Sequence, residues 1–134
     1  MSVYVAGPVE RAWRLLPDWV VTCYELIESA SERTGSIARR PYAEKDLDAL
    51  GAEKFSAEIQ NRIKKADHVV AVFLPNDPSV PVECAIAALT GKRVMLIHNE
   101  ARGLPRIFAG LGGLRLELWG STTANSIRRF LAIS

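Results

Sequence analysis

The spacing of apolar residues along the chain predicts strands that alternate with helices. Short apolar runs predict strands at residues 3–6, 36–39, 68–74, 93–98 and 114–119. Between them and at residues 121–133, apolar residues recur three or four positions apart, which is the spacing of one helix face. The fourth of these predicted helices is short and covers residues 103–111. The second helix begins at either Glu44 or Ala52 and ends near Lys65. Each predicted strand is therefore followed by a predicted helix.

The central strands are apolar on both faces, which is typical of a parallel sheet. The clearest example is the run at residues 68–74, which is continuous and rich in β-branched side chains. Because strands and helices alternate strictly, we expect an α/β fold with helices on both faces of the sheet. Five strands fit the doubly wound, flavodoxin-like order 2-1-3-4-5. With 134 residues, the chain is expected to form one domain over residues 1–134.

The composition excludes several classes of protein. With 49% hydrophobic and 24% charged residues, the chain has the mixture of a globular protein rather than of a disordered or collagen-like one. The net charge of +2 arises from scattered residues, so we do not expect polymeric nucleic acid as a partner. Small basic clusters at residues 39–40, 64–65 and 128–129 are interpreted as solvated ends of helices and strands. One or two of these residues could still meet a single small phosphate.

Neither metal chemistry nor secretion is indicated. Cys23 and Cys84 each lie in an apolar helical pattern, so we expect buried free thiols. His68 and His98 are isolated in strands, and we expect no metal and no cofactor. The N-terminus lacks the basic region and long apolar core of a secretory signal, and no apolar run reaches membrane-spanning length. We therefore expect a cytoplasmic location.

A single carboxylate, Glu83, lies in the otherwise uncharged run at residues 78–89, just after the third strand. A lone buried carboxylate is costly, so it must be paired or functional. Ligands of open parallel sheets bind beyond the carboxyl ends of the strands, where the strand order reverses. Here that point lies between the first and third strands, so Tyr4 and Asp77 could approach Glu83. Alternatively, Glu83 only satisfies helix amides.

The spacing of these residues resembles that of the nucleoside 2-deoxyribosyltransferase family and its relatives, the deoxynucleoside 5′-monophosphate N-glycosidases. In that family an aromatic residue and Ala-Gly-Pro mark the first strand, here residues 4–8. An acidic or serine residue stands six places before a Glu, here Asp77 and Glu83. A helix of small residues then ends in Gly-Lys, here residues 91–92. The likeness extends over residues 3–98 and is most specific at residues 67–97.

The resemblance implies chemical roles for three residues. Glu83 would be the nucleophile that attacks the anomeric carbon, displaces the nucleobase and forms a glycosyl-enzyme ester. Asp77 would contact the base and assist proton transfer to the leaving nitrogen, or alternatively would only form a turn or helix cap. Tyr4 would hydrogen-bond Glu83 and orient it, or would simply be a half-buried strand aromatic.

Five further residues are expected to bind the substrate, namely Gly7, Pro8, Ser79, Glu58 and Arg11. Gly7 permits close approach of the backbone to a sugar or phosphate. Ser79 offers a hydroxyl or an amide at a helix start, unless it serves only as the N-cap. Arg11 could reach a 5′-phosphate. Where the family carries a substrate-contacting Asp, this chain has Ile59, and the adjacent Glu58 is the candidate substitute.

We therefore expect an enzyme that cleaves the N-glycosidic bond of a (deoxy)nucleoside or nucleoside 5′-monophosphate and passes the sugar to water or another base. The alternative is a non-catalytic nucleotide-binding or sensing module on the same fold. A flavodoxin needs a phosphate loop rich in Ser, Thr and Gly after the first strand, and a receiver domain needs an acidic pair there. Residues 6–10 provide neither. Relatives complete their sites with a neighbouring subunit, so the resemblance implies a homodimer or larger homo-oligomer.

Overall fold

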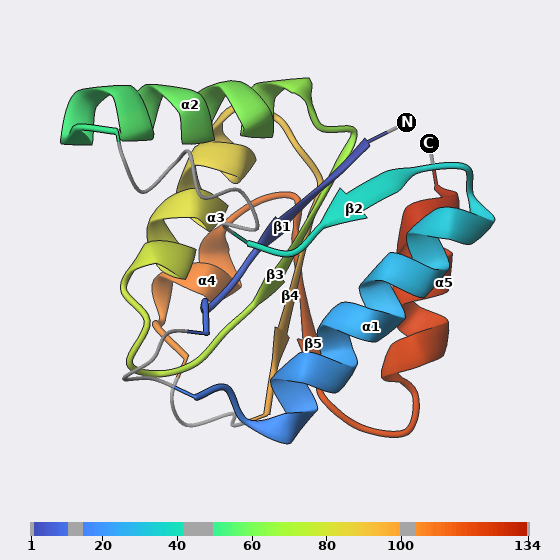
Figure 1. Ribbon diagram of the computed structural model, residues 1–134. Coiled ribbons are helices and arrows are strands. Elements are labelled where there is room, and N and C mark those ends of the chain that lie inside the picture. The colour runs from blue at the N-terminus through green and yellow to red at the C-terminus, as the bar shows by residue number, and fades with distance from the viewer. Residues whose placement is uncertain (1, 11–14, 42–49, 100–103, 134) are drawn as a thin grey trace.

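The computed structural model describes residues 2–10, 15–41, 50–99 and 104–133, which form five strands and five helices (Figure 1). The strands are β1 (Ser2–Ala6), β2 (Ile37–Arg39), β3 (His68–Val72), β4 (Val94–His98) and β5 (Leu114–Leu118). The helices are α1 (Asp18–Arg33), α2 (Ala52–Lys65), α3 (Ser79–Leu89), α4 (Ile107–Gly110) and α5 (Thr123–Ala132). Strands and helices alternate throughout, as predicted.

The strands form one parallel sheet in the order β2-β1-β3-β4-β5. This order confirms the predicted flavodoxin-like α/β fold. The register places Tyr4 of β1 beside Arg39 of β2 and Val69 of β3. Residues that lie side by side in register point to the same face of a sheet, so these three side chains share a face.

Helices cover both faces of the sheet, with α1 and α5 on one face and α2, α3 and α4 on the other (Figure 1). Along β3, Val70 and Val72 pack with α1 and α5, whereas Val69 and Ala71 pack with α2 and α3. Both faces of the strand are thus buried, which explains its uninterrupted apolar sequence. Tyr4 packs against the apolar residues that lie between the sheet and helices α2 and α3, so its side chain is on that face of the sheet.

The first two helices begin where the backbone preferences indicate. α1 starts directly after Pro17, and the missing amide hydrogen of proline costs nothing at that end of a helix. α2 starts at Ala52, after the extended residue Gly51. The other predicted start, Glu44, lies outside the described residues. The face of α2 that packs on the sheet is apolar and is formed by residues spaced four apart, Phe55, Ile59 and Ile63.

The third and fourth helices end at glycines. Gly91 follows α3 with a φ of 78°, a left-handed conformation that glycine adopts without a Cβ clash. α4 is shorter than the predicted helix at residues 103–111, because Pro105 precedes it and the glycine pair at residues 112–113 follows it closely.

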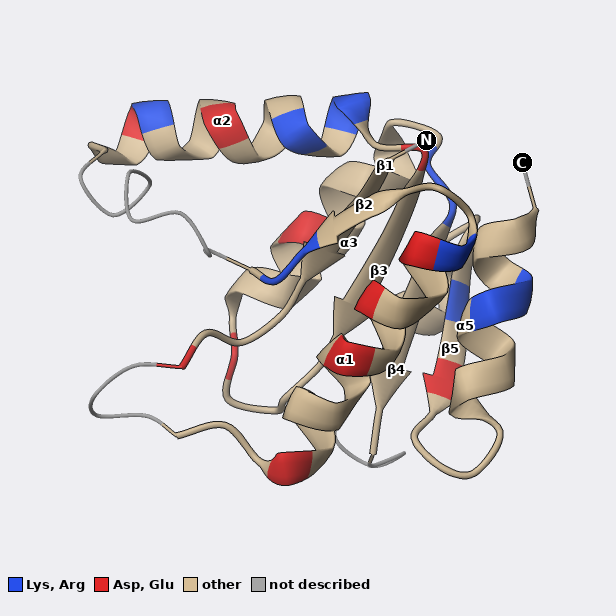
Figure 2. Cartoon of the chain, turned by 45° about the vertical axis from the view of Figure 1, so that its right-hand side comes forward, with Lys and Arg blue, Asp and Glu red and all other residues tan. Residues whose placement is uncertain are grey.

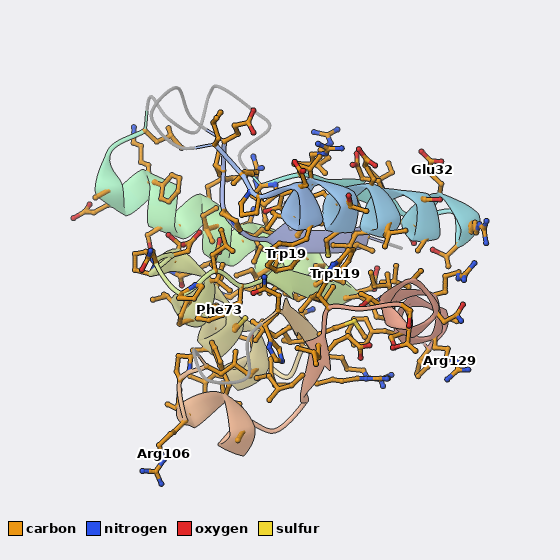
Figure 3. All side chains as sticks on the ribbon, turned by 90° about the horizontal axis from the view of Figure 1, so that it is seen from below. Trp19, Glu32, Phe73, Arg106, Trp119 and Arg129 are labelled. Atoms are coloured by element: carbon orange, nitrogen blue, oxygen red, sulfur yellow. The ribbon has the colours of Figure 1, made fainter. Side chains whose placement is uncertain are left out.

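Two tryptophans contact each other on the α1 and α5 face of the sheet, near the carboxyl ends of the strands. Trp19 lies in the first turn of α1, and Trp119 directly follows β5. Their ring centroids are 5.7 Å apart with the planes tilted by 43° (Figure 3), a favourable aromatic contact. In the described part of the chain, no helix is long and apolar enough to cross a membrane.

Candidate active site

A hydrogen bond joins the first strand to the third helix. The hydroxyl of Tyr4 donates to Oε1 of Glu83 over 2.5 Å, although the two residues are 79 positions apart. β1 directs Tyr4 toward the α2 and α3 face, and α3 packs on that face through Val80, Glu83, Cys84 and Ala87. This spacing of three and four is the inward stripe of a helix, so Glu83 occupies a core position. The predicted contact between Tyr4 and Glu83 is present.

Burial dominates the acidity of Glu83. Only 5% of the residue is exposed, and loss of hydration raises the pKa of its carboxyl from 4.5 to about 7. The hydrogen bond from Tyr4 lowers this pKa, because it stabilises the carboxylate, and the negative charge of Asp77 raises it. A carboxyl with this pKa exists in both its charged and neutral forms near neutral pH, which suits a group that must change its charge during a reaction.

Asp77 lies close to Glu83 but also has a local structural contact. It follows β3, is buried, and accepts a hydrogen bond of 2.9 Å from the backbone amide of Ser79 through Oδ1. This contact is the turn role that was considered as the alternative for Asp77. α3 begins at Ser79, so Glu83 is the fifth residue of the helix rather than part of its first turn.

A cavity of about 310 Å³ opens beside Glu83, between α2 and α3. We call it the Glu83 cavity. Its lining residues are Phe55, Ser56 and Ile59 of α2 and Pro78, Ser79, Val82, Glu83 and Ile86 of the α3 segment. The lining is mainly apolar with one carboxylate and two serines, a mixture typical of small-molecule sites. Ser79, which was predicted to bind the substrate, lines this cavity.

Phe55 and Ser56 were not predicted as site residues. Phe55, Ile59 and Ile63 are spaced four residues apart and form one apolar face of α2, and such a face is typical of core residues. In the structure Ile63 is fully buried, whereas Phe55 and Ile59 border the Glu83 cavity. The signal available in the sequence was an aromatic residue at the beginning of an apolar helix stripe.

Gly7 and Pro8 are buried and directly follow β1, and the side chain that approaches them is Tyr24 of α1. Its hydroxyl donates a 2.7 Å hydrogen bond to the backbone oxygen of Pro8. A Cβ atom at Gly7 would overlap the same hydroxyl. The observed close approach at Gly7 is therefore made by Tyr24, and neither Gly7 nor Pro8 is among the described residues that line the Glu83 cavity.

Glu58 is not among the described residues that line the Glu83 cavity. It forms an ion pair of 2.9 Å with Arg62 one turn further along α2, and the adjacent Ile59 lines the cavity in its place. The structure thus does not bring Glu58 to Glu83. Arg11 lies outside the described residues.

The buried thiols do not supply a second nucleophile. Burial raises the pKa of Cys23 to about 12. Burial raises the pKa of Cys84 to about 12 as well, with a further contribution from the negative charge of Glu83. Thiols with these pKa values stay protonated at neutral pH. Across residues 2–10, 15–41, 50–99 and 104–133, no group of three or more His, Cys, Asp or Glu side chains could hold a metal ion.

The fold and the cavity define a doubly wound α/β protein with a buried carboxylate beside its central strands. Among solved structures, the chain is similar to the CMP N-glycosidase BcmB of Clostridium botulinum, with a TM-score of 0.68 and 14% identity over 99% of this chain and 100% of that one. It is also similar to a 2-deoxyribosyltransferase of Bacillus psychrosaccharolyticus, with a TM-score of 0.67 and 15% identity over 97% and 92% of the two chains.

A conserved protein of Enterococcus faecalis V583 has the same fold, with a TM-score of 0.56 and 17% identity over 96% of this chain and 86% of that one. No family model matches the sequence, and no curated protein matches it. At these identities the likeness establishes the fold, which these structures share over nearly the whole chain.

Proposed function

We propose that the protein cleaves the N-glycosidic bond of a nucleoside or nucleotide with Glu83 as the nucleophile. The observation that carries the proposal is the buried Tyr4–Glu83 pair at the edge of a cavity of small-molecule size. The folds of a CMP N-glycosidase and a 2-deoxyribosyltransferase support it, because the chain aligns with both over nearly its full length.

In the first proposed step, a carboxylate oxygen of Glu83 bonds to the anomeric carbon of the sugar. The carbon–nitrogen bond breaks, and the nucleobase departs with its electron pair. Because Tyr4 donates to Oε1, we assign the attack to Oε2. The departing nitrogen must gain a proton, which is supplied by water, and we propose that Asp77 assists this transfer. The products of the step are the free base and a glycosyl ester of Glu83.

In the second proposed step, water or another nucleobase attacks the anomeric carbon and releases Glu83 as a carboxylate. Water gives hydrolysis, and a base gives transfer. Two displacements at one carbon retain its configuration, as in retaining glycosidases. Tyr4 contributes to both steps, because its hydrogen bond fixes the orientation of Glu83 and favours the ionised form of the carboxyl.

The proposal is tested by incubating the protein with nucleosides and 5′-monophosphates, in ribo and deoxy forms, and measuring free base by chromatography. We expect release by the wild type and loss of at least a thousandfold in Glu83→Ala, roughly the range for removal of a catalytic nucleophile. Glu32→Ala is the matched control, because Glu32 lies on the exposed side of α1, far from the cavity (Figure 3). Undiminished release by Glu83→Ala would refute the assignment. Binding of substrate without any release would favour the sensing module.

We further propose that a second copy of the chain packs against the exposed side of α3 that borders the Glu83 cavity. Val82 is 59% exposed and Leu89 is 83% exposed there, and Val82 also lines the Glu83 cavity. Val82 and Leu89 are seven residues apart and so lie on one side of the helix, and exposed apolar patches are typical of an interface. A second copy at this position would lie directly beside the proposed active site.

A further inference from the structure

The strand β5 forms one border of the sheet, and in the part of the chain that the structure describes no strand pairs with its outer side. Such an open edge can accept a strand from another chain, and proteins protect their edges with short strands, proline or charges of one sign. The opposite border is protected in this way, because β2 has three residues and residues 39–40 are both arginine. β5 has five residues, with neither lysine nor proline.

Two hydrogen bonds show which backbone groups of β5 face outward. The amide of Trp119 donates to the backbone oxygen of His98 over 2.6 Å, and the backbone oxygen of Gly113 accepts from the amide of Val94 over 2.9 Å. The odd-numbered residues therefore turn their backbone groups toward β4. Because these groups point to opposite sides in successive residues of a strand, the amide and carbonyl of Leu116 face the open edge.

The α4 side of β5 carries a row of leucines that is only partly covered. Leu114 packs with the apolar residues beneath α4, and Leu116 and Leu118 project on the same face because alternate residues of a strand share a face. α4 has only four residues and leaves these two leucines 38% and 57% exposed. Exposed leucines in a row on an open edge strand are typical of a contact site.

The other face of β5 carries one basic and one acidic residue, Arg115 and Glu117 (Figure 2). Within the chain, Nη2 of Arg115 lies 4.0 Å from Oε2 of Glu117, a long distance for an ion pair. The side chain of Arg115 is 49% exposed, so it is accessible to a second carboxylate. The order Leu-Arg-Leu-Glu-Leu makes the strand complementary to a copy of itself that runs in the opposite direction.

We propose that β5 pairs antiparallel with β5 of a second copy of the chain, with Leu116 of one copy opposite Leu116 of the other. In this register Arg115 of each copy lies opposite Glu117 of the other. Leu114 lies opposite Leu118. Each Leu116 amide donates to the carbonyl oxygen of the other Leu116, so the contact is symmetric about a two-fold axis.

The charges select this register. Opposite charges and apolar side chains that face each other across two strands stabilise the pairing, whereas like charges destabilise it. A shift by two residues in one direction would place Arg115 opposite Arg115, and a shift in the other direction would place Glu117 opposite Glu117. Only the register centred on Leu116 therefore joins every charge to an opposite one.

This contact is separate from the one proposed at α3, and it does not depend on the proposed reaction. α3 packs on β3 and β4, whereas the strand pairing uses the outer edge of β5. A protein that uses both contacts would form an assembly larger than a dimer.

The register is tested by oxidising the Leu116→Cys protein with diamide and separating the products on a denaturing gel without reductant. The two Cα atoms at position 116 would be about 5.5 Å apart in a hydrogen-bonded antiparallel pair, a distance that suits a disulfide. We expect most of this protein to become a covalent dimer. The native thiols Cys23 and Cys84 are buried, so the wild type should give no such dimer.

Leu118→Cys is the matched control. Leu118 is more exposed than Leu116, but in the proposed register it lies four residues, about 14 Å, from its counterpart in the second copy. A disulfide cannot span that distance, so Leu118→Cys should give about tenfold less covalent dimer or lower. Equal or greater cross-linking of Leu118→Cys, or none of Leu116→Cys, would overturn the proposal. Leu89→Glu, on α3, should leave the yield of Leu116→Cys unchanged.

Charge reversal tests the same pairing without a covalent bond, in the Leu89→Glu background. Arg115→Glu and Glu117→Arg each place like charges opposite each other, so each should dimerise about tenfold more weakly or worse in sedimentation equilibrium. A mixture of the two variants should restore the dimer, because each charge of one chain then faces an opposite charge of the other. Mixing cannot repair an ion pair within one chain. Undiminished dimerisation of both variants, or a mixture that associates no more tightly than either alone, would overturn the proposal.

Discussion

The hydrogen bond from Tyr4 to Glu83 leads to a quantitative prediction for Tyr4→Phe. The substitution removes the hydroxyl and keeps the ring that packs against α2 and α3. This hydrogen bond lowers the pKa of Glu83, which burial holds at about 7. Without the bond, the carboxylate loses stabilisation while its burial persists. The pKa of Glu83 in Tyr4→Phe must therefore be higher than in the wild type.

The size of the shift follows from the strength of a hydrogen bond to a charged group. Such a bond contributes about 1.5–3 kcal/mol, and one pKa unit corresponds to about 1.4 kcal/mol. The pKa of Glu83 should therefore rise by about one to two units. The ionised fraction at pH 7 would fall from about one half to about a tenth or less, and activity should fall about fivefold to fiftyfold.

The assay is the pH dependence of kcat/KM for base release, which reports groups of the free enzyme. We expect the wild-type curve to rise with pH through about 7, because Glu83 must lose its proton to attack. The midpoint for Tyr4→Phe should lie about one to two pH units higher, with activity partly restored in alkaline solution.

Tyr24→Phe is the matched control for this prediction. It also removes a buried hydroxyl, but that hydroxyl donates to the backbone oxygen of Pro8 rather than to Glu83. Its midpoint should match that of the wild type, whatever happens to its maximal rate. An unchanged or lower midpoint in Tyr4→Phe would refute the role assigned to the hydrogen bond.

Three further predictions concern stability and assembly. Because the pKa of Glu83 is about 7 in the fold against an ordinary 4.5, wild-type stability should fall as pH rises through this window. Glu83→Gln should therefore be more stable than the wild type at pH 8, by about 3 kcal/mol or less in urea unfolding, and an equal gain at pH 4 would contradict this. Gly7→Ala should cost about 1–3 kcal/mol through overlap with Tyr24, and Tyr24→Phe in the same chain should restore part of the loss in thermal unfolding. Leu89→Glu should reduce the size of the oligomer in light scattering, whereas a monomeric wild type would contradict the proposed interface.

The fold could be predicted from the sequence because its signals are local. The run at residues 68–74 can be buried on both faces only in a sheet covered by helices, and the alternation of elements then restricts the strand order. The ends of the helices could be predicted less well. Pro105 before α4 and the glycines after it make this helix shorter than its apolar pattern indicates. The approach of Tyr4 to Glu83 could be predicted because β1 and β3 had to be neighbours.

The cavities could not be predicted, because they depend on how α2 packs against α3 and the sheet. Phe55 and Ile59 belong to an apolar stripe that looks like core, and only the packing leaves a space beside them. The basic residues were interpreted as separate solvated clusters. The register of β2 and the position of α2 bring Arg39 and Lys65 to a second cavity, between α2 and the strand pair β1 and β2.

The most direct test of the central claim is mass spectrometry of the protein quenched during turnover. A 2′-fluorinated nucleoside is a suitable substrate, because fluorine destabilises the positive charge on the sugar and slows both steps. We predict a protein heavier by one sugar residue, with the added mass on the peptide that contains Glu83 and absent from Glu83→Gln. Base release without any sugar-bearing protein, or a sugar attached to another residue, would contradict Glu83 as the nucleophile.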